Sequence, residues 1–367
     1  MYRSGVAGIG RYSQNLINNL LAIDRDDEFV LFMTKEDYRE FNNAKCQMPN
    51  VKIIQTEIKH FTLAEQTKFG KIIEKEKLDL MHFLNFNHPV SYKGKFIITI
   101  HDLTLFHFPD TAKKTNFIKR AAFRYVMSSA CKNAVKILAD SKSTKNDIEK
   151  VFKTESRRID VIYFAADDKT FLKIEPRQIE QIKKKYKVET PVILTVSQFR
   201  PHKNLVGLVE AFGLLRKEMP CRLVILGKPD PKHTSLKEAV ERSPFKNDII
   251  MPGFVSDEDL AAWYKIATCF VFPSLYEGFG LPGLEAMQAG TPVVASNTSS
   301  LPEIYRDAAI YFDPFQTEDI SAKIKAVLEN EKLRVELSRK GKIQAQCFSW
   351  KKTASETLDL YQQIQNA

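Results

Sequence analysis

Short apolar runs alternate with stretches of helical periodicity along the whole chain. Between the runs, apolar side chains recur at helical spacing, as in the stripe of Leu205, Leu208, Val209, Phe212 and Leu215. This alternation predicts parallel sheets covered by helices on both faces. The runs that predict strands are residues 29–33, 51–54, 80–83, 96–100, 135–139 and 161–163, then 192–196, 223–226, 249–251, 270–272, 293–295 and 310–312.

The predicted strands form two sets, separated by a charged, strand-poor stretch at residues 167–190. A length of 367 residues also favours two domains, because domains typically hold about 150 residues. We therefore expect two doubly wound α/β lobes, at residues 1–170 and 171–350. Ligands of such sheets bind beyond the carboxyl ends of the strands, so the site is expected there, in a cleft between the lobes.

Composition limits the possible settings and partners. No run of eighteen apolar residues occurs and the first residues lack the apolar core of a signal peptide, so we expect a cytoplasmic protein without a membrane span. Five scattered cysteines lack metal-ligand spacing and fit a reduced compartment. The net charge of +10 favours an anionic partner: a membrane surface, a sugar nucleotide or a nucleic acid. Nucleic acid is disfavoured, because aromatic residues such as Trp263 and Trp350 have the pattern of packing residues.

The segment from Ser274 to Glu285, with the sequence SLYEGFGLPGLE, follows an apolar strand and opens a helix. The first N–H groups of a helix have no partner within it, and they attract anions. Two carboxylates eight positions apart, Glu277 and Glu285, could accept hydrogen bonds from sugar or ribose hydroxyls. The alternative is a loop that needs glycine, with a glutamate that only favours the helix dipole. The glycines that allow close approach to a ligand are Gly278, Gly280 and Gly283.

A basic loop precedes the helix predicted to run through Met219. Lys203 lies at the expected start of this helix, where a cation opposes the helix dipole unless an anion compensates. A diphosphate would supply that negative charge, and Arg200 and His202 lie beside the lysine. The alternative is a solvated basic loop.

Glu277 and Glu285 reproduce the Glu-x7-Glu signature of retaining family 4 glycosyltransferases, which are nucleotide-sugar-dependent enzymes of the GT-B fold. The chain resembles this family over nearly its whole length, most strongly at residues 190–315. The other segments that carry the resemblance are Gly8-Ile-Gly-Arg-Tyr12, Thr99-Ile-His101-Asp102, Ser197-Gln-Phe-Arg-Pro-His-Lys-Asn204, Gly253-Phe-Val-Ser-Asp-Glu-Asp-Leu260 and Pro292-Val-Val-Ala-Ser296.

The resemblance implies transfer of a hexosyl unit, with retained configuration, from a nucleotide-diphosphate sugar to a hydroxyl acceptor. It implies GDP-mannose or a UDP-hexose as co-substrate, with no cofactor and no metal, and a final helix at 351–367 that packs on the first lobe. Glu285 would hold the ribose and Glu277 the sugar, while His101 contacts the sugar from the first lobe. The leaving diphosphate would be stabilised by Lys203, Arg200 and the backbone around Gly278, Phe279, Gly280 and Leu281, with Gly8 and Gly10 near it in the first lobe.

Two departures from the family pattern affect these expectations. Many relatives carry arginine where this chain has Gln198, so Arg200 or Lys203 is expected to take over its role. The family also has a strand before the loop at Gly8 and Gly10, and this first strand is missing here, as in a truncated or misassigned start. Neighbouring strand edges would then be exposed. The glycines are not spaced as in a dinucleotide-binding motif, and an ordinary turn remains the alternative.

The acceptor and the cellular location are less constrained. A glycan or lipid-linked acceptor in surface polysaccharide or glycolipid synthesis would bind the variable loops 85–92 and 106–115. The basic segment 113–136 is either a domain helix with a solvated face or a peripheral contact with the inner leaflet of the plasma membrane. Rival functions are a GT-B-like epimerase or phosphorylase, and a non-catalytic nucleotide-sugar binder. Ser300 and Glu303 have capping-box spacing and are expected to be structural.

Overall fold

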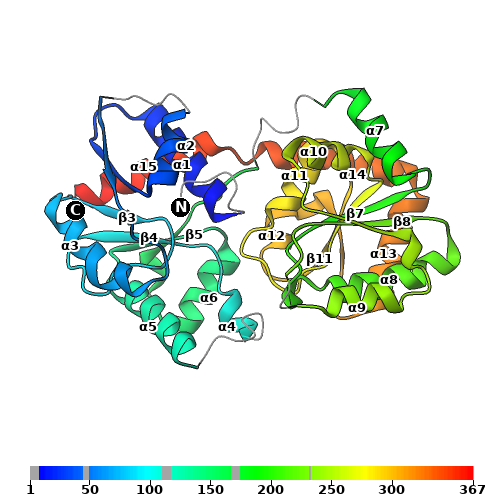
Figure 1. Ribbon diagram of the computed structural model, residues 1–367, viewed down its shortest axis with the longest axis horizontal. Helices are drawn as coiled ribbons and strands as arrows, with labels where there is room; N and C mark the ends of the chain where they lie inside the picture. The colour runs from blue at the N-terminus through cyan, green and yellow to red at the C-terminus, as the bar shows by residue number, and fades with distance from the viewer. Residues whose placement is uncertain (1–7, 44–48, 110–116, 167–173, 231–232, 367) are drawn as a thin grey trace. The chain divides into compact units, whose positions relative to one another are not determined.

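The computed structural model describes residues 8–43, 49–109, 117–166, 174–230 and 233–366. The chain divides into two compact units, each with its own parallel sheet (Figure 1). The first unit comprises residues 1–103, 114–164 and 349–367, and the second comprises residues 104–113 and 165–348.

The strands of the first unit form two separate parallel sheets. The larger has the order β3-β4-β5-β6, and the smaller contains only β1 and β2, with Phe29 opposite Val51. Figure 1 shows α1 and α15 on one side of the larger sheet and α5 and α6 on the other. The elements are α1 (Ile9–Ile23), β1 (Phe29–Met33), α2 (Lys35–Asn43), β2 (Val51–Gln55), the π-helix η1 (Glu65–Phe69), α3 (Gly70–Lys75), β3 (Met81–Phe83), β4 (Phe96–Ile100), α5 (Phe117–Asn133), β5 (Lys136–Ala139), α6 (Lys142–Phe152), the 3₁₀ helix η3 (Ser156–Arg158), β6 (Ile159–Val161) and α15 (Trp350–Gln365).

The second unit has one sheet of order β12-β11-β10-β7-β8-β9, which is doubly wound from β7. Helices α8, α9 and α13 lie on one side of it, and α10, α11 and α14 on the other (Figure 1). The elements are α4 (Thr104–His107), α7 (Pro176–Tyr186), β7 (Val192–Val196), η4 (Pro201–Lys203), α8 (Leu205–Glu218), β8 (Arg222–Leu226), α9 (Ser235–Arg242), η5 (Lys246–Asp248), β9 (Ile249–Gly253), α10 (Asp257–Ile266), β10 (Cys269–Phe272), α11 (Leu281–Ala289), β11 (Val293–Ser296), α12 (Leu301–Tyr305), η6 (Arg306–Ala308), β12 (Ala309–Phe312), α13 (Thr317–Glu329) and α14 (Glu331–Gln346).

Each predicted strand is present, and most begin and end within a residue or two of the expected limits. The largest shift is β6, which occupies Ile159–Val161 instead of 161–163. Ile159 is buried and pairs with Ile137, so the strand begins as soon as the turn of η3 ends. Residues 1–7, where the missing first strand was considered, lie outside the described residues, and the described strands of the first unit form two sheets.

The predicted stripe on α8 forms part of the core of the second unit. Leu208, Phe212 and Leu215 are fully buried against strands β7, β8 and β10 and helix α13. The neighbouring strands are apolar throughout because both faces of a parallel sheet are covered. Burial of these runs stabilises the unit that carries most of the predicted site.

The last helix, α15, packs on the first unit against α1. The ring of Trp350 stacks on Phe164 with centroids 5.8 Å apart. Further along, the Tyr361 hydroxyl lies 2.6 Å from His82 Nδ1. The helix therefore joins the first unit through both aromatic packing and buried polar contacts.

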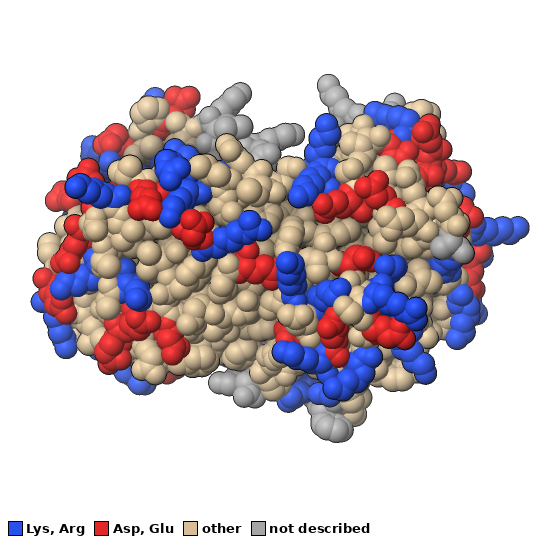
Figure 2. All heavy atoms as spheres, turned by 180° about the vertical axis from the view of Figure 1, so that it is seen from behind, with Lys and Arg blue, Asp and Glu red and all other residues tan. Residues whose placement is uncertain are grey.

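The surface and the cysteines carry less information. No helix in the described ranges is long and apolar enough to cross a membrane. Cys131, Cys221, Cys269 and Cys347 are free, and Cys46 lies outside the described residues. On the face shown in Figure 2, basic and acidic side chains are intermixed. Net charge by itself therefore does not mark a binding surface on that face.

We predict that Phe212→Ala lowers the free energy of unfolding of the second unit by about 3–5 kcal/mol, because it removes a fully buried ring and leaves a cavity. Phe315→Ala is the matched control: its ring is 70% exposed, and we expect a change within about 0.5 kcal/mol. Urea unfolding followed by circular dichroism measures both. Equal losses in the two variants would contradict this account of the core.

Candidate functional site

Two loops of the second unit meet where neighbouring strands end. β7 and β10 are adjacent in the sheet, and the loops that follow them contain Lys203 and Glu277. The backbone N–H of Leu275 donates to the carbonyl of His202 at 2.8 Å. This bond fixes the loops against each other at the carboxyl edge of the sheet.

Lys203 and Glu277 form a partly buried ion pair. Lys203 Nζ lies 2.7 Å from Glu277 Oε1, and the side chains are only 18% and 12% exposed. Ser274 Oγ donates to the same carboxylate oxygen at 2.6 Å, and the N–H of Glu277 donates to Ser299 Oγ at 2.9 Å. Glu277 thus supplies the negative charge that compensates the lysine.

Lys203 lies just before the long helix, close to its predicted position. It ends the short 3₁₀ turn η4, and α8 begins at Leu205 after Asn204 adopts a left-handed conformation. The carboxylate of Glu277, across the loop, compensates the charge of Lys203.

Gly280 shapes the start of α11. Its φ of 101° is a conformation that side chains rarely adopt, and an added Cβ would lie 2.5 Å from the Tyr305 hydroxyl. That hydroxyl donates to the Gly280 carbonyl. Leu281 and Pro282 then begin the helix, and the N–H of Gly283 donates to the Gly280 carbonyl at 3.2 Å. Glycine is therefore required at position 280, both for its backbone conformation and for the space that the Tyr305 hydroxyl occupies.

Glu285 lies deeper than predicted. Because α11 begins at Leu281, Glu285 starts the second helical turn and not the first. It is 4% exposed, and its Oε2 lies 2.9 Å from the hydroxyl of Tyr264 on α10. Tyr264 was not identified from the sequence, since nothing in the helical pattern distinguishes it from a core residue.

Neighbouring side chains support the Glu277 loop. Ser300 is the N-cap residue of α12, as its spacing to Glu303 indicated, but its hydroxyl makes no cap bond and donates to the Glu277 carbonyl at 3.0 Å. Gly278 and Phe279 are buried, and the Phe279 ring packs edge-on against Phe348. Phe279 therefore offers a ligand its backbone and not its ring.

The other members of the basic loop differ in charge and exposure. Arg200 and Gln198 are exposed, and Arg200 precedes η4. Burial, followed by the charge of Lys203, lowers the pKa of His202 to about 3. His202 is thus neutral near pH 7, so the positive charge of this loop comes from Lys203 and Arg200.

His101 follows β4 in the first unit, and its ring lies between two hydrogen-bond acceptors. Its Nδ1 donates to Asp140 Oδ2 at 2.7 Å, and its Nε2 donates to the Leu84 carbonyl at 3.1 Å. Two acceptors on opposite sides of one ring favour the doubly protonated form. Burial opposes this charge, but the charge and hydrogen bond of Asp140 outweigh it and raise the pKa of His101. A contact from Nε2 to a ligand would replace the bond to Leu84.

Asp140 was not predicted as a site residue, although its position in the sequence indicates one. It directly follows β5, the neighbour of β4, just as His101 follows β4. Parallel strands end at one edge of a sheet, so both residues were bound to lie there. Only the hydrogen bond between His101 and Asp140 could not be predicted without the structure.

The amino-terminal glycines occupy the start of α1. Gly8 has φ 68° and precedes the helix, which begins at Ile9. Gly10 is buried within the first turn, so it belongs to the helix and not to a glycine loop.

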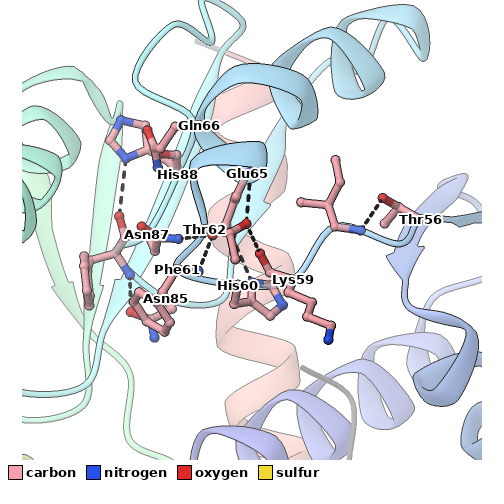
Figure 3. Close-up of polar contacts among 12 residues, drawn as sticks. Thr56, Lys59, His60, Phe61, Thr62, Glu65, Gln66, Asn85, Asn87 and His88 are labelled. Carbon is pink, nitrogen blue, oxygen red and sulfur yellow. Dashed lines mark hydrogen bonds and ion pairs between the residues drawn. The ribbon is translucent and has the colours of Figure 1, made fainter.

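A second polar cluster surrounds the buried Glu65 in the first unit (Figure 3). Its carboxylate accepts from His60 Nδ1 at 2.9 Å, from the N–H of Phe61 at 2.6 Å and from Asn87 Nδ2 at 2.5 Å. Gln66 Nε2 adds a bond of 2.9 Å to the His88 carbonyl. The π-helix η1 thereby holds the loop 85–92, and π-helical turns are frequent at functional sites. No sequence pattern marked Glu65.

Two family models match the chain. One, described as Glycosyltransferase Family 4, covers residues 6–169, and the other, described as Glycosyl transferases group 1, covers residues 177–344. The O-antigen chain mannosyltransferase B of Escherichia coli is 30% identical over 97% of this chain and 96% of its own length. The chain belongs to glycosyltransferase family 4. It is a glycosyltransferase, as the Glu277 and Glu285 signature predicted.

Further comparisons agree with this family. The O-antigen chain mannosyltransferase RfbU of Salmonella typhimurium is 27% identical over 66% of this chain and 63% of its own length. Among solved structures, the sucrose-phosphate synthase of Thermosynechococcus elongatus has a TM-score of 0.77 at 21% identity, covering 98% of this chain and 94% of its own. Anabaena Alr3699/HepE in complex with UDP and glucose has a TM-score of 0.75 at 16% identity, covering 98% and 97%. These similarities show the GT-B fold.

Within this family 4 glycosyltransferase, no group of three or more His, Cys, Asp or Glu side chains is placed to hold a metal ion, as far as the described residues extend.

The predicted site residues fall in both units. Lys203, Glu277, Gly280 and Glu285 gather at one edge of the second unit's sheet, while His101, Gly8 and Gly10 belong to the first unit.

We predict that Asp140→Asn lowers the pKa of His101, because the buried ring loses the negative charge that favours its protonation. In the parent protein the raised pKa stabilises the fold below about pH 6.5, the ordinary value for histidine, and this contribution is lost as the pH rises through the higher folded value. NMR titration of His101 and unfolding between about pH 5 and 8 measure both effects.

His82 provides an internal reference for this titration. Burial, with a further contribution from the nearby His101 charge, lowers its pKa to about 3, so it stays neutral across the range. The assignment of His101 as a cation fails if its titration is the same with Asp140 and with asparagine.

Proposed function

We propose that this glycosyltransferase transfers a mannosyl unit from GDP-mannose to a hydroxyl of a growing surface polysaccharide, with retained configuration and without a metal ion. The curated relatives named above are O-antigen chain mannosyltransferases, which supports mannose and a polysaccharide acceptor. The observation that carries the proposal is the partly buried pair of Lys203 and Glu277 beside the start of α11.

The ion pair suits a donor that has both an anion and hydroxyl groups. A diphosphate brought to Lys203 would take over the cation from Glu277. The released carboxylate of Glu277 could then accept hydrogen bonds from the sugar hydroxyls, with Ser274 still holding one of its oxygens. One bound donor would thus supply partners to both Lys203 and Glu277, which neutralise each other when no donor is bound.

Charge on the leaving diphosphate is the main demand of the reaction. Lys203 and the N–H groups of Gly280 and Leu281 would stabilise it in a site of low water content, where fixed donors are most effective. Arg200, exposed at the start of η4, would add charge on the side where Gln198 replaces the arginine of many relatives. This donor set needs no metal to balance the diphosphate.

Glu285 would hold the nucleotide ribose. The hydroxyl of Tyr264 binds one of its oxygens at 2.9 Å and fixes the carboxylate. Each carboxylate oxygen has two acceptor positions, so Glu285 retains capacity for a ribose hydroxyl.

Retention would follow from a front-face reaction. In this route the bond between the anomeric carbon and the phosphate oxygen breaks, the leaving phosphate takes the proton of the acceptor hydroxyl, and the hydroxyl oxygen bonds to the anomeric carbon on the same face. A double displacement needs a carboxylate nucleophile about 5 Å from an acid. In the donor complex proposed above, Ser274 and the donor hydroxyls would engage Glu277, which leaves it no role as a nucleophile.

The acceptor would bind near the loop 85–92 of the first unit. Gln66 holds this loop through the His88 carbonyl and the N–H of Val90, and Glu65 holds it through Asn87 (Figure 3). A loop fixed by several bonds can orient an acceptor at low entropic cost. The second acceptor loop, 106–115, lies partly outside the described residues.

Helix α5 would contact an anionic membrane surface. Ile118 and Tyr125 are 70% and 64% exposed, and Lys119, Arg120 and Arg124 on the same helix are exposed as well. Exposed apolar side chains among cations suit the headgroup region of an anionic bilayer. Lys113 and Lys114, also named in the predicted segment, lie outside the described residues.

We predict that GDP-mannose raises the thermal midpoint of the protein in a panel with UDP-glucose and UDP-galactose, since a ligand that binds the folded state stabilises it. Lys203→Ala should abolish this shift and lower kcat by about 100- to 1,000-fold, the usual cost of removing one charge-stabilising donor. Lys217→Ala, an exposed lysine of α8 in the same unit, is the control and should change neither. A full shift with Lys203→Ala would refute the phosphate role, and turnover abolished by EDTA would refute metal independence.

We predict that Arg120→Glu combined with Arg124→Glu weakens binding to phosphatidylserine vesicles by at least about tenfold, because each cation near an anionic bilayer contributes about 1 kcal/mol. Lys332→Glu with Arg339→Glu on α14 gives the same charge change at exposed sites of the second unit. Vesicle cosedimentation at low salt compares the pairs. Equal losses would mean that net charge and not α5 governs binding.

A further inference from the structure

The imidazole of His101 has a third neighbour besides its two hydrogen-bond acceptors. The ring of Tyr12 on α1 meets it in a T-shaped contact, with centroids 4.7 Å apart and an angle of 75° between the planes. Tyr12 is buried, with 4% of the residue exposed. Ring pairs favour such edge contacts, which have a defined geometry. The orientation of the imidazole therefore depends on Tyr12 as well as on Asp140 and the Leu84 carbonyl.

Two further rings hold Tyr12 in place. Its ring meets Phe164 with centroids 5.6 Å apart and Trp350 with centroids 5.9 Å apart, both in T-shaped contacts. Phe164 lies just beyond β6, and Trp350 is the first residue of α15. Tyr12 therefore cannot turn away from the imidazole without disturbing rings from two other parts of the first unit.

The hydroxyl of Tyr12 has a separate role. It lies 3.3 Å from Thr99 Oγ1, which in turn lies 2.9 Å from His82 Nε2. These contacts satisfy a buried hydroxyl that would otherwise cost stability. The distance of 3.3 Å is long for a bond between two hydroxyls, whose usual value is about 2.7–2.8 Å. The packed rings, more than the hydroxyl, thus fix Tyr12, and phenylalanine should hold the imidazole equally well.

The Tyr12 ring becomes more important when a ligand binds His101. A ligand contact at Nε2 replaces the bond to the Leu84 carbonyl, so the bond from Nδ1 to Asp140 is then the only one left of the two. An imidazole held by one hydrogen bond can still tilt about that bond. The ring of Tyr12 blocks this movement by contact. Displacement of a site group by about 1 Å can slow a reaction about 100-fold, so this restraint matters for turnover.

We propose that Tyr12 is a positioning residue for His101, whose ring keeps the imidazole oriented when a donor sugar replaces the Leu84 carbonyl at Nε2. The inference rests on the proposed function and on the sugar contact expected of His101. It means that α1, and α15 through Trp350, support the site without supplying a group that touches the substrate.

The first test measures, by NMR, how fast the Nδ1 proton of His101 exchanges with water, in the free protein and with GDP-mannose. Its signal is assigned by its loss in His101→Gln. Tyr12→Met keeps much of the apolar volume without the flat ring. We expect this change to speed the exchange by about tenfold or more, because the imidazole and its bond to Asp140 are no longer held still. Tyr12→Phe should stay within about twofold of the parent protein, because it retains the ring.

Leu16→Ala is the matched control for a general loosening of α1. Leu16 is fully buried on the same helix, one turn beyond Tyr12, and its truncation also lowers stability. Circular dichroism checks that each variant is folded. The proposal is overturned if Tyr12→Met leaves the exchange unchanged, or if Leu16→Ala or Tyr12→Phe speeds it as much as Tyr12→Met does.

The second test measures release of GDP from GDP-mannose with a mannose oligosaccharide as acceptor. Tyr12→Met should lower kcat by about tenfold or more, because a misplaced His101 affects the reacting sugar. The donor KM should change by less than about threefold, because groups of the second unit hold the diphosphate and the ribose in the proposed function. An unchanged kcat would overturn the positioning role.

Failure of the proposed function would give a different result. If GDP-mannose does not raise the thermal midpoint of the parent protein, the proposed donor is wrong. The exchange rates of the free protein still decide whether Tyr12 holds His101, because they need no donor.

Discussion

The compensation of one partly buried charge by another organises the candidate donor site. Lys203 and Glu277 come from loops that follow neighbouring strands, and each would be costly to leave alone in a site that is mostly shielded from water. Hydroxyls of Ser274, Ser299 and Ser300 hold the carboxylate and its backbone in place. The loop conformation, the left-handed glycine at 280 and the position of α11 all agree with this pairing.

The first unit also pairs a buried basic side chain with a carboxylate, namely His101 with Asp140. His101 and Asp140 follow adjacent strands, and the charge and hydrogen bond of Asp140 raise the pKa of a buried ring that burial alone would lower. Both units thus place these charged residues at the carboxyl edge of a parallel sheet, where the loops that follow the strands leave room for polar groups. Glu65 adds a buried carboxylate that fixes the loop 85–92 by accepting from both backbone and side chains.

The described strands of the first unit form two sheets, with β1 paired to β2 and β3 paired to β4. Residues of β1, β3 and α1 line one cavity in this unit. The second unit has no comparable interruption in its described sheet, where β7 lies between β10 and β8. The two units therefore share a parallel α/β architecture but differ in how their described strands are divided into sheets.

The sequence alone determined the strands, the two-lobe α/β class and the family, because apolar runs must be buried and the Glu-x7-Glu motif is local. It also indicated Lys203, Glu277 and His101 as site residues. Only the tertiary structure decided their partners, since Lys203 and Glu277 lie 74 positions apart and His101 and Asp140 lie 39 apart. The structure places Lys203 just before the long helix and Glu285 in the second turn of α11. It also shows that the Ser300 hydroxyl donates to the Glu277 carbonyl. Contacts of this kind depend on how loops meet after folding, and no periodicity along the chain encodes them.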